Sequence, residues 1–194
     1  MRYPKEHKAR TRQKIVEIAA REFREKGLEG VGVADLMASA GLTHGGFYAH
    51  FGSKEALVEA ACRHGVAATI ETLDFRARQA PPGEGLRTIV RTYLSRAHRD
   101  DAARGCIMPS LAGEIARRAP ETRKAFTDQL RAFAAVIARQ LPGDDEAARE
   151  QRALAIAASL VGAIALARSV DDPALSDAIL EAARTAALEA GAER

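Results

Sequence analysis

Apolar residues in this chain recur every three or four positions between sharp breaks, a spacing that fits helices and leaves no candidate for a strand. The breaks are glycines and prolines, and the firmest is Ala-Pro-Pro-Gly at 80–83. Alanine dominates the apolar residues and tryptophan is absent, which favours helix over sheet. We therefore predict an all-α fold of about nine helical segments.

Helix caps and stops place these segments along the chain. Before the break we expect a helix ending at Gly27, one from Val33 to Ala40, one capped by Thr43 and one capped by Ser53. After it we expect 86–97, a helix interrupted near its start by Pro109, 120–141, 145–170 and 172–191. A turn is expected at 99–101.

Two of the short segments are neighbours, joined by a tight connection at Gly41. Two short helices separated by a turn of about three or four residues are typical of a helix-turn-helix, whose second helix enters the major groove of DNA. The second of them lies in 42–54, which reads LTHGGFYAHFGSK. The sequence therefore predicts a DNA-binding unit near its N-terminus.

The side chains of 42–54 divide between a small core and a DNA-facing surface. Phe47 and Phe51 are four positions apart, so we expect them to pack inward together with Leu42. Tyr48 and His50 fall outside that stripe, where they can donate hydrogen bonds to phosphate oxygens. Such contacts position a protein on DNA without reading its sequence.

Two adjacent glycines, Gly45 and Gly46, stand in the first turn of the second helix, where base edges are approached most closely. Without a Cβ atom they let the backbone come near the DNA, although each costs a helix about 1 kcal/mol. Lys54 adds a cation at the start of the next helix, where the Ser53 and Lys54 amides offer further donors. Binding to DNA explains this mixture better than packing does.

Residues 8–60 resemble the N-terminal domain of the TetR family of transcriptional regulators, mainly through GLEGVGVADLMASAGLTHGGFYAHFGSKEAL at 27–57. The resemblance implies base-facing positions at His44, Gly45 and Gly46, phosphate-facing positions at Thr43, Tyr48, His50 and Lys54, and backbone or minor-groove contacts from Arg10 and Arg12. His44 stands where the family commonly has Lys, which leaves the base preference open. Gly32 stands where Ser or Thr commonly caps a helix, and implies a cap weaker by a few tenths of a kcal/mol.

Positive charge is concentrated at the N-terminus. Residues 1–14 hold six Lys/Arg and one Glu, a balance of +5, whereas 65–194 hold eighteen residues of each sign. An arm of this kind suits a polyanion, or is a solvated tail that aids solubility.

We predict a DNA-binding domain at 1–53 and a helical ligand-binding and dimerisation domain at 54–194, as the resemblance implies. The helix at 145–170 is apolar around most of its circumference, which indicates burial. We expect a homodimer through a four-helix interface made by this helix and 172–191; the alternative is an internal core helix. A twofold dimer sets the reading helices about 34–36 Å apart and implies an inverted-repeat operator.

A ligand site is indicated only in outline. Gly105 and Pro109 interrupt a helix and leave backbone polar groups to be satisfied. The candidate ligand-binding residues are Tyr93, Cys106, Met108, Phe126 and Phe133. They would form a mostly apolar site with one hydroxyl, suited to a small hydrophobic or aromatic molecule; the alternative is that the aromatic residues belong to the core.

The function predicted from these features is a repressor that a small ligand releases from its operator, although activation stays open. An alternative is a redox or electrophile sensor at Cys106, if a helix N-terminus lowers the pKa of that thiol. A remote alternative is a helical enzyme or adaptor, since no catalytic, phosphate-binding or dinucleotide motif occurs.

Cofactors, metals and membranes are not expected. Cys62 and Cys106 lack metal-ligand spacing, and no histidine pairs with a carboxylate at such a spacing. The chain opens without an apolar signal segment, and the apolar run 153–167 is too short to span a bilayer. We predict a soluble cytoplasmic protein.

Overall fold

The computed structural model describes residues 5–192, which form helices joined by short loops and contain no strand. The helices are α1 (Lys5–Lys26), α2 (Val33–Ser39), the 3-10 helix η1 (His44–Ala49), α3 (Lys54–Gln79), α4 (Gly85–Tyr93), α5 (Arg96–Asp100), α6 (Ile107–Ile115), α7 (Pro120–Ala138), α8 (Glu146–Ser169) and α9 (Pro173–Ala192). The prediction of an all-α fold is confirmed.

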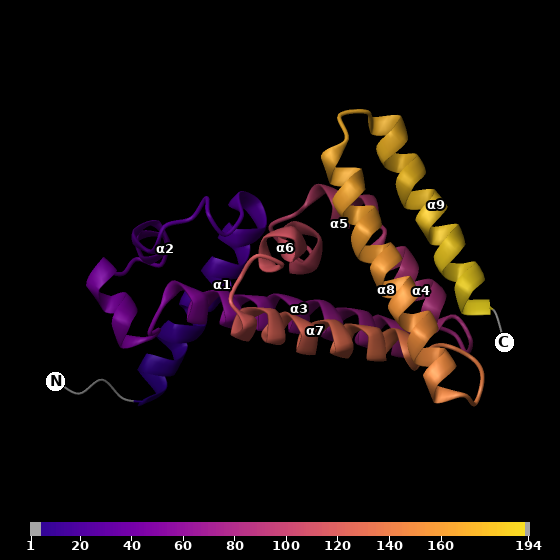
Figure 1. The fold of residues 1–194 in the computed structure, drawn as a ribbon, viewed down its shortest axis with the longest axis horizontal. Coiled ribbons are helices and arrows are strands. Elements are labelled where there is room, and N and C mark those ends of the chain that lie inside the picture. The colour runs from indigo at the N-terminus through magenta and orange to yellow at the C-terminus, as the bar shows by residue number, and fades with distance from the viewer. Residues whose placement is uncertain (1–4, 193–194) are drawn as a thin grey trace.

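The helices form an elongated molecule with a small unit at one end (Figure 1). That unit contains α1, α2 and η1, and it leads into α3, which runs side by side with α7 through the middle of the molecule. At the other end α8 and α9 form an antiparallel pair, which packs against α7 and α4. The N-terminal unit and the α8–α9 pair therefore lie at opposite ends.

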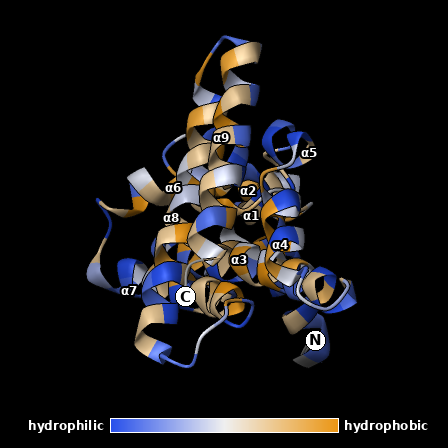
Figure 2. Ribbon diagram, turned by 90° about the vertical axis from the view of Figure 1, so that its right-hand side faces the viewer, coloured by the Kyte–Doolittle hydropathy of each residue, from blue (hydrophilic) through white to orange (hydrophobic). Residues whose placement is uncertain are grey.

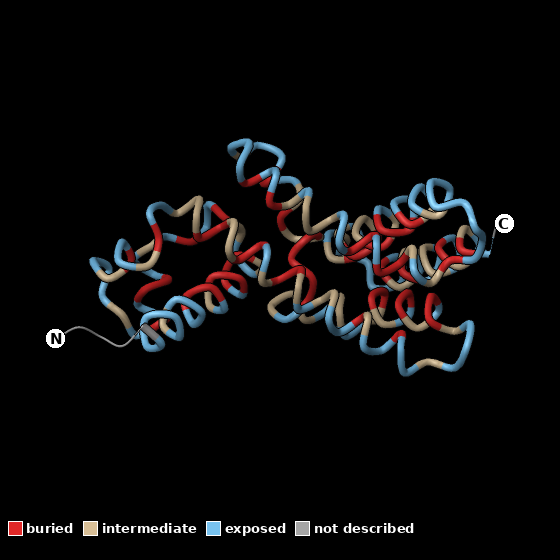
Figure 3. The backbone as a smooth tube through the Cα atoms, turned by 90° about the horizontal axis from the view of Figure 1, so that it is seen from below, coloured by how far each residue is buried: buried red, intermediate tan, exposed pale blue. Residues whose placement is uncertain are grey.

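One continuous apolar core joins the two ends. Figure 3 shows its buried segments, in red, facing inward on both sides of the junction. Helix α3 packs against α1, α4 and α7, and contacts with α7 extend from Glu55 to Asp74, so α3 belongs to both units by packing. A unit of about fifty residues buries too little surface to be stable alone, and this shared helix supplies the missing cover. The boundary at 53/54 stays a prediction.

Most predicted helix ends are confirmed by their hydrogen bonds. The Ser53 hydroxyl accepts the Ala56 N–H at 3.1 Å and caps α3, and Pro120 stands at the first position of α7. Gly41 ends α2 with a φ of 71°, a left-handed conformation that favours glycine. The carboxylate oxygens of Asp145 and Asp172 accept N–H groups in the first turns of α8 and α9.

Two local predictions were wrong. The expected helix 86–97 ends at Tyr93, and the Ser95 hydroxyl accepts the His98 N–H at 3.2 Å to start α5, which includes part of the expected turn. The second helix of the helix-turn-helix is a 3-10 helix, and the Thr43 side chain makes no capping hydrogen bond. Instead the Thr43 carbonyl accepts the Gly46 N–H at 3.0 Å, a tighter turn than an α-helix makes.

Helix α8 is the one helix in the described range that is long and apolar enough to cross a membrane, with a mean hydropathy of 1.5 over its most apolar 18 residues. The expectation that its apolar run is too short does not hold for the whole helix, which has 24 residues. One side of it, including Ile156, Leu160 and Ile164, is buried against the protein core. Length and composition alone do not distinguish such a helix from a core helix of a soluble protein.

Candidate nucleic-acid interface and adjoining cavity

The α2–turn–η1 element presents a packed inner side and an open outer side. Phe47 and Phe51 are 1% and 4% exposed, and their rings stack with centroids 5.7 Å apart. The predicted inward packing of both rings is confirmed, and Leu42 lies half-buried against the same core. These contacts fix the orientation of η1, so that its other side faces solvent.

The outer side of η1 carries His44, Gly45 and Tyr48, all of them exposed. The Tyr48 side chain is 65% exposed, and its ring meets that of His44 edge-on at 6.2 Å. A Cβ atom at Gly45 would meet no atom within 4 Å, whereas one at Gly46 would contact Met37 and Thr43 at 3.6 Å. The outer side of the backbone is therefore open at Gly45, whereas Gly46 packs against Met37 and Thr43. The sequence alone did not distinguish these two glycines.

The predicted cationic residues lie around this surface in different ways. Arg10 and Arg12 are exposed on α1, and the Arg12 guanidinium carbon lies 4.7 Å from the centroid of the Phe51 ring. The Lys54 ammonium donates to the Leu28 carbonyl at 2.6 Å. Lys54 thus holds the α1–α2 connection as well as adding charge, a structural role that its sequence position did not reveal.

His50 lies half-buried at the end of η1, and its Nδ1 has no hydrogen-bond partner among the described residues. Burial lowers its pKa, and the nearby Lys8, Arg12 and His7 lower it further. A neutral imidazole among cations is placed to gain a proton when an anion approaches. This environment fits the predicted contact with a phosphate.

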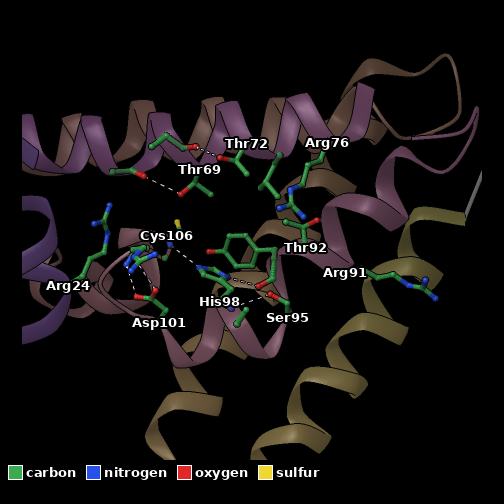
Figure 4. Close-up of a pocket in the computed structure, with 17 residues that line it drawn as sticks. Arg24, Thr69, Thr72, Arg76, Arg91, Thr92, Ser95, His98, Asp101 and Cys106 are labelled. Carbon is green, nitrogen blue, oxygen red and sulfur yellow. Dashed lines mark hydrogen bonds and ion pairs between the residues drawn. The ribbon is translucent and has the colours of Figure 1, made fainter. Parts of the chain in front are cut away.

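A cavity of about 660 Å³ lies behind this unit, between α3, the end of α4, α5 and the loop 101–106 (Figure 4). Of the five predicted ligand-binding residues, Tyr93 and Cys106 line it. Met108 and Phe133 are buried in the core, and Phe126 packs partly buried against that core. The five residues therefore do not form one site, although the Tyr93 and Phe133 rings are neighbours at 5.4 Å.

The lining of the cavity also differs from the predicted single hydroxyl. Carbon atoms form the larger part of its wall, but several hydroxyl and guanidinium groups line it too. The hydroxyl groups belong to Thr69, Thr72, Thr92, Tyr93 and Ser95, and the guanidinium groups to Arg24, Arg76, Arg91 and Arg104. None of the four arginines was predicted from the sequence as a cavity residue, because they are scattered over α1, α3, α4 and a loop.

His98 ties two backbone segments together at the cavity wall. Its Nε2 accepts the Cys106 N–H at 2.8 Å, so its Nδ1 carries the proton that is donated to the Tyr93 carbonyl at 2.5 Å. Burial lowers the pKa of His98, and Arg168 and Arg24 oppose its protonation. The imidazole is therefore neutral and joins the end of α4 to the start of α6.

We predict that His98→Ala reduces the free energy of unfolding by about 1–3 kcal/mol near neutral pH, because two buried backbone groups lose their partner. Unfolded His98 takes up a proton below its ordinary pKa of 6.5, whereas the native residue, with a lowered pKa, resists it. Its contribution to stability is thus present at higher pH and is lost as the pH falls through that range. Urea unfolding of both proteins at about pH 7.5 and about pH 5.5 measures this, and the gap should shrink at the lower pH. An equal difference in unfolding free energy between the two proteins at both pH values would contradict this prediction.

Cys106 does not have the environment that the sensor alternative requires. It occupies the N-cap position of α6, as expected, but its side chain is buried and only 1% of the residue is exposed. Burial raises the pKa of the thiol, against smaller lowering effects from the Tyr93 hydroxyl and the Met108 backbone. The expected lowering of the pKa by a helix N-terminus is therefore wrong.

Polar contacts connect the N-terminal unit to the rest of the chain at a second place. A Glu114 side-chain oxygen at the end of α6 accepts the Leu28 N–H at 2.9 Å. Arg118 pairs with Glu55 at 2.9 Å and also with Glu29. Helix α6 thus runs from the cavity wall at its start to the α1–α2 connection at its end.

A helix-turn-helix with an open reading surface, mounted on a larger helical body with a cavity, defines a DNA-binding regulator. A family model of bacterial regulatory proteins of the tetR family matches residues 15–61. A second one, of the C-terminal domain of LmrA/YxaF-like transcriptional regulators, matches residues 82–183, which is more than half of the chain. The chain belongs to the TetR family of transcriptional regulators.

Curated relatives support this family over part of their length. The repressor AcnR of Corynebacterium efficiens is 33% identical over 121 residues, which cover 61% of this chain and 57% of that protein. The regulator TtgR of Pseudomonas putida is 40% identical over 60 residues, 31% of this chain and 29% of that protein. The matches thus span less than two thirds of the relatives' own length.

Solved structures share the whole fold. A TetR-family regulator from Cytophaga hutchinsonii superposes with a TM-score of 0.78 at 22% identity, covering 97% of this chain and 98% of that one. The reduced form of NemR from Escherichia coli gives 0.74 at 22% identity, covering 92% and 95%. At this identity the likeness establishes the fold and leaves the ligand unspecified.

Proposed function

We propose that this TetR-family regulator is a repressor that binds an inverted-repeat operator as a homodimer and leaves it when a small molecule occupies the cavity. The observation that carries the DNA-binding part is the outer side of η1. Gly45 leaves the backbone open, and Tyr48 and His44 stand exposed beside it. Phosphate contacts from Thr43, Tyr48, His50 and Lys54 would then position the helix, and Gly45 and Gly46 would let its backbone approach the bases.

The steep salt dependence of DNA binding tests this function directly. We expect DNA fragments selected by the purified protein to share one inverted repeat, because a twofold dimer presents two equivalent reading helices. Affinity for that repeat should fall steeply as salt rises, since phosphate contacts release counterions. Selection of no common sequence, together with no binding at low salt, would refute the regulator function for this chain.

The predicted dimer interface is supported by the outer side of the α8–α9 pair. Figure 2 looks onto this end of the molecule and shows apolar segments along both helices. Between Leu154 and Leu166 the exposed or partly exposed residues of α8 are all small or apolar: Leu154, Ala155, Ala158, Ser159, Val161, Gly162, Ala165 and Leu166. A second copy of the chain would cover this face and allow close helix approach, whereas the buried side of α8 already packs on its own core.

We predict that Ala158→Glu, at the centre of the exposed side of α8, raises the dimer dissociation constant at least about tenfold, because a carboxylate would be buried between the copies. Light scattering should then give the monomer mass of 20.8 kDa for the variant at a concentration where the parent protein is a dimer. Ala132→Glu, an exposed alanine within α7, is the matched control and should leave the mass unchanged. An unchanged mass for Ala158→Glu would place the interface elsewhere.

Two observations favour a ligand-released regulator over an enzyme, an adaptor or a sensor at Cys106. Family membership favours a regulator over a helical enzyme or adaptor. A sensor at Cys106 would have to act through a buried thiol with a raised pKa, so Cys106→Ser should leave the response to a ligand intact. A cytoplasmic location follows from the proposed role, since the operator lies there.

A further inference from the structure

The cavity carries more positive charge than its surroundings neutralise. It has one carboxylate, Asp101, which pairs with Arg104 at 3.4 Å. Arg24, Arg76 and Arg91 also line the cavity, and none of the three forms an ion pair among residues 5–192. Cations that line a concave surface without counter-charges favour an anion there.

Arg24 is the least satisfied of these groups. Its Nη1 donates to the Ala103 carbonyl at 2.7 Å, but its buried Nε has no partner in the described part of the chain. Arg168 lies behind the same wall, and its hydrogen bonds go to the carbonyls of His98 and Arg99 and to the Ser110 hydroxyl. Burial lowers the pKa of both guanidiniums, and repulsion from Arg168 lowers the pKa of Arg24 further. An anion would relieve this repulsion.

The donors available to a ligand include the guanidinium groups and the Tyr93 hydroxyl, which has no hydrogen-bond partner in the described part of the chain. Thr69 and Thr72 donate to carbonyls of their own helix, at 3.1 and 2.9 Å. In Figure 4 Arg24 and Arg76 lie at opposite ends of the group of lining residues, and Arg91 points away from it. Gly65, beside Arg24, and Arg76 are eleven residues apart on α3, so the two ends are separated by about 16 Å.

We infer that the cavity binds an organic anion, a carboxylate on an apolar body, and that Arg24 reports its binding to the DNA-binding unit. This inference rests on the proposed function and specifies the class of its ligand. The apolar part of the wall, with Leu73, Tyr93 and Ala97, would hold the body of the molecule. The volume fits a drug-sized molecule.

Arg24 connects the cavity to the DNA-binding unit because it belongs to α1. Among the residues that line the cavity it is the only one from that unit, and it stands about 18 Å along the same helix from Arg12. A carboxylate that draws the guanidinium into the cavity competes with its hydrogen bond to Ala103, in the loop that leads into α6. Both α1 and α6 reach the helix-turn-helix side, so ligand and operator affinities become coupled in both directions.

Calorimetry with three matched compounds tests the ligand class on the protein without DNA. The probes are 4-phenylbutyrate, its neutral amide and the cationic 4-phenylbutylamine. We expect the carboxylate to bind at least about tenfold more tightly than either of the others, because only it pairs with the guanidiniums. Equal or tighter binding of the amide or the amine, or no binding of the carboxylate, would overturn the inference.

Three variants separate the role of Arg24 from a general effect of charge. Arg24→Met should weaken 4-phenylbutyrate binding about tenfold or more, because the single carboxylate pairs at the Arg24 end of the cavity. Arg76→Met, at the other end, and Arg117→Met, which removes an exposed arginine at the end of α6, should each have a clearly smaller effect. If Arg24→Met fails to fold, Arg24→Lys tests the same position with the charge kept and should bind the carboxylate more tightly than the amide. Carboxylate binding unaffected by Arg24→Met, or lost equally in Arg76→Met, would contradict the inference.

The coupling is measured with the selected operator. In the parent protein 4-phenylbutyrate should lower operator affinity, whereas folded Arg24→Met should bind the operator without responding to the compound. An unchanged response in Arg24→Met would refute the reporting role of this residue. If no operator can be selected, the proposed function fails. The calorimetry does not depend on DNA, so it still tests the ligand class in that case.

Discussion

Gly45→Leu should lower affinity for the selected operator by about 100-fold, or about 2.7 kcal/mol, and leave the fold intact. The φ of Gly45 is not positive, and a Cβ atom there would meet no protein atom within 4 Å, so the native backbone accepts the larger residue. In the proposed complex the same open space is filled by DNA. The leucine side chain would then hold η1 away from the base edges. Fluorescence anisotropy gives the affinity, and thermal unfolding checks the fold.

Gly113→Leu is the matched control for this experiment. Gly113 is exposed on α6, and a Cβ atom there also meets nothing within 4 Å, so the same change is made on a surface that the proposal leaves free of DNA. We expect this control to bind the operator normally. Normal binding by Gly45→Leu as well would show that the outer side of η1 is not the reading surface.

The helix-turn-helix could be predicted from sequence because its determinants are local. Gly41, Phe47 and Phe51 lie within eleven residues, and their spacing alone specifies a turn and an inward stripe. The type of helix could not be predicted in the same way. A 3-10 turn and an α-turn start with similar residues, so the local sequence does not separate the two types.

The break between α4 and α5 shows a second limit. Apolar spacing continues through Leu94 and Ala97, so Ser95 looked like an interior residue of one helix. In the structure its hydroxyl caps α5, and His98 fixes the new direction through the Tyr93 carbonyl. A serine within a helical pattern can be an interior residue of one helix or the N-cap of a new one, and tertiary contacts decide between these roles.

The cavity was the least predictable part because its polar groups meet only after folding. Arg24 and Ala103 are 79 residues apart, and the Cys106 N–H reaches His98 across a loop. A solvated arginine and a cavity arginine have the same sequence signature. The predicted apolar residues could not be assigned from sequence either, because a core residue and a pocket residue share the same helical spacing.

Phe133→Ala should reduce the free energy of unfolding by about 3–5 kcal/mol, because it leaves a void in a close-packed core. Phe133 is 0% exposed and lies beside Tyr93, with ring centroids 5.4 Å apart. Both α7, which carries it, and the neighbouring α8 would lose packing. Urea unfolding of the parent protein and the variant at the same protein concentration measures the loss.

Phe126→Ala, on the same helix, is the comparison that separates core from ligand site. Phe126 is only partly buried at the edge of the core, so its removal should cost clearly less, about 1–2 kcal/mol. Neither variant should change the affinity for 4-phenylbutyrate as strongly as Arg24→Met does, because neither ring lines the cavity. A small loss of stability in Phe133→Ala with a large loss of carboxylate binding would reverse this assignment and restore the aromatic ligand site that the sequence suggested.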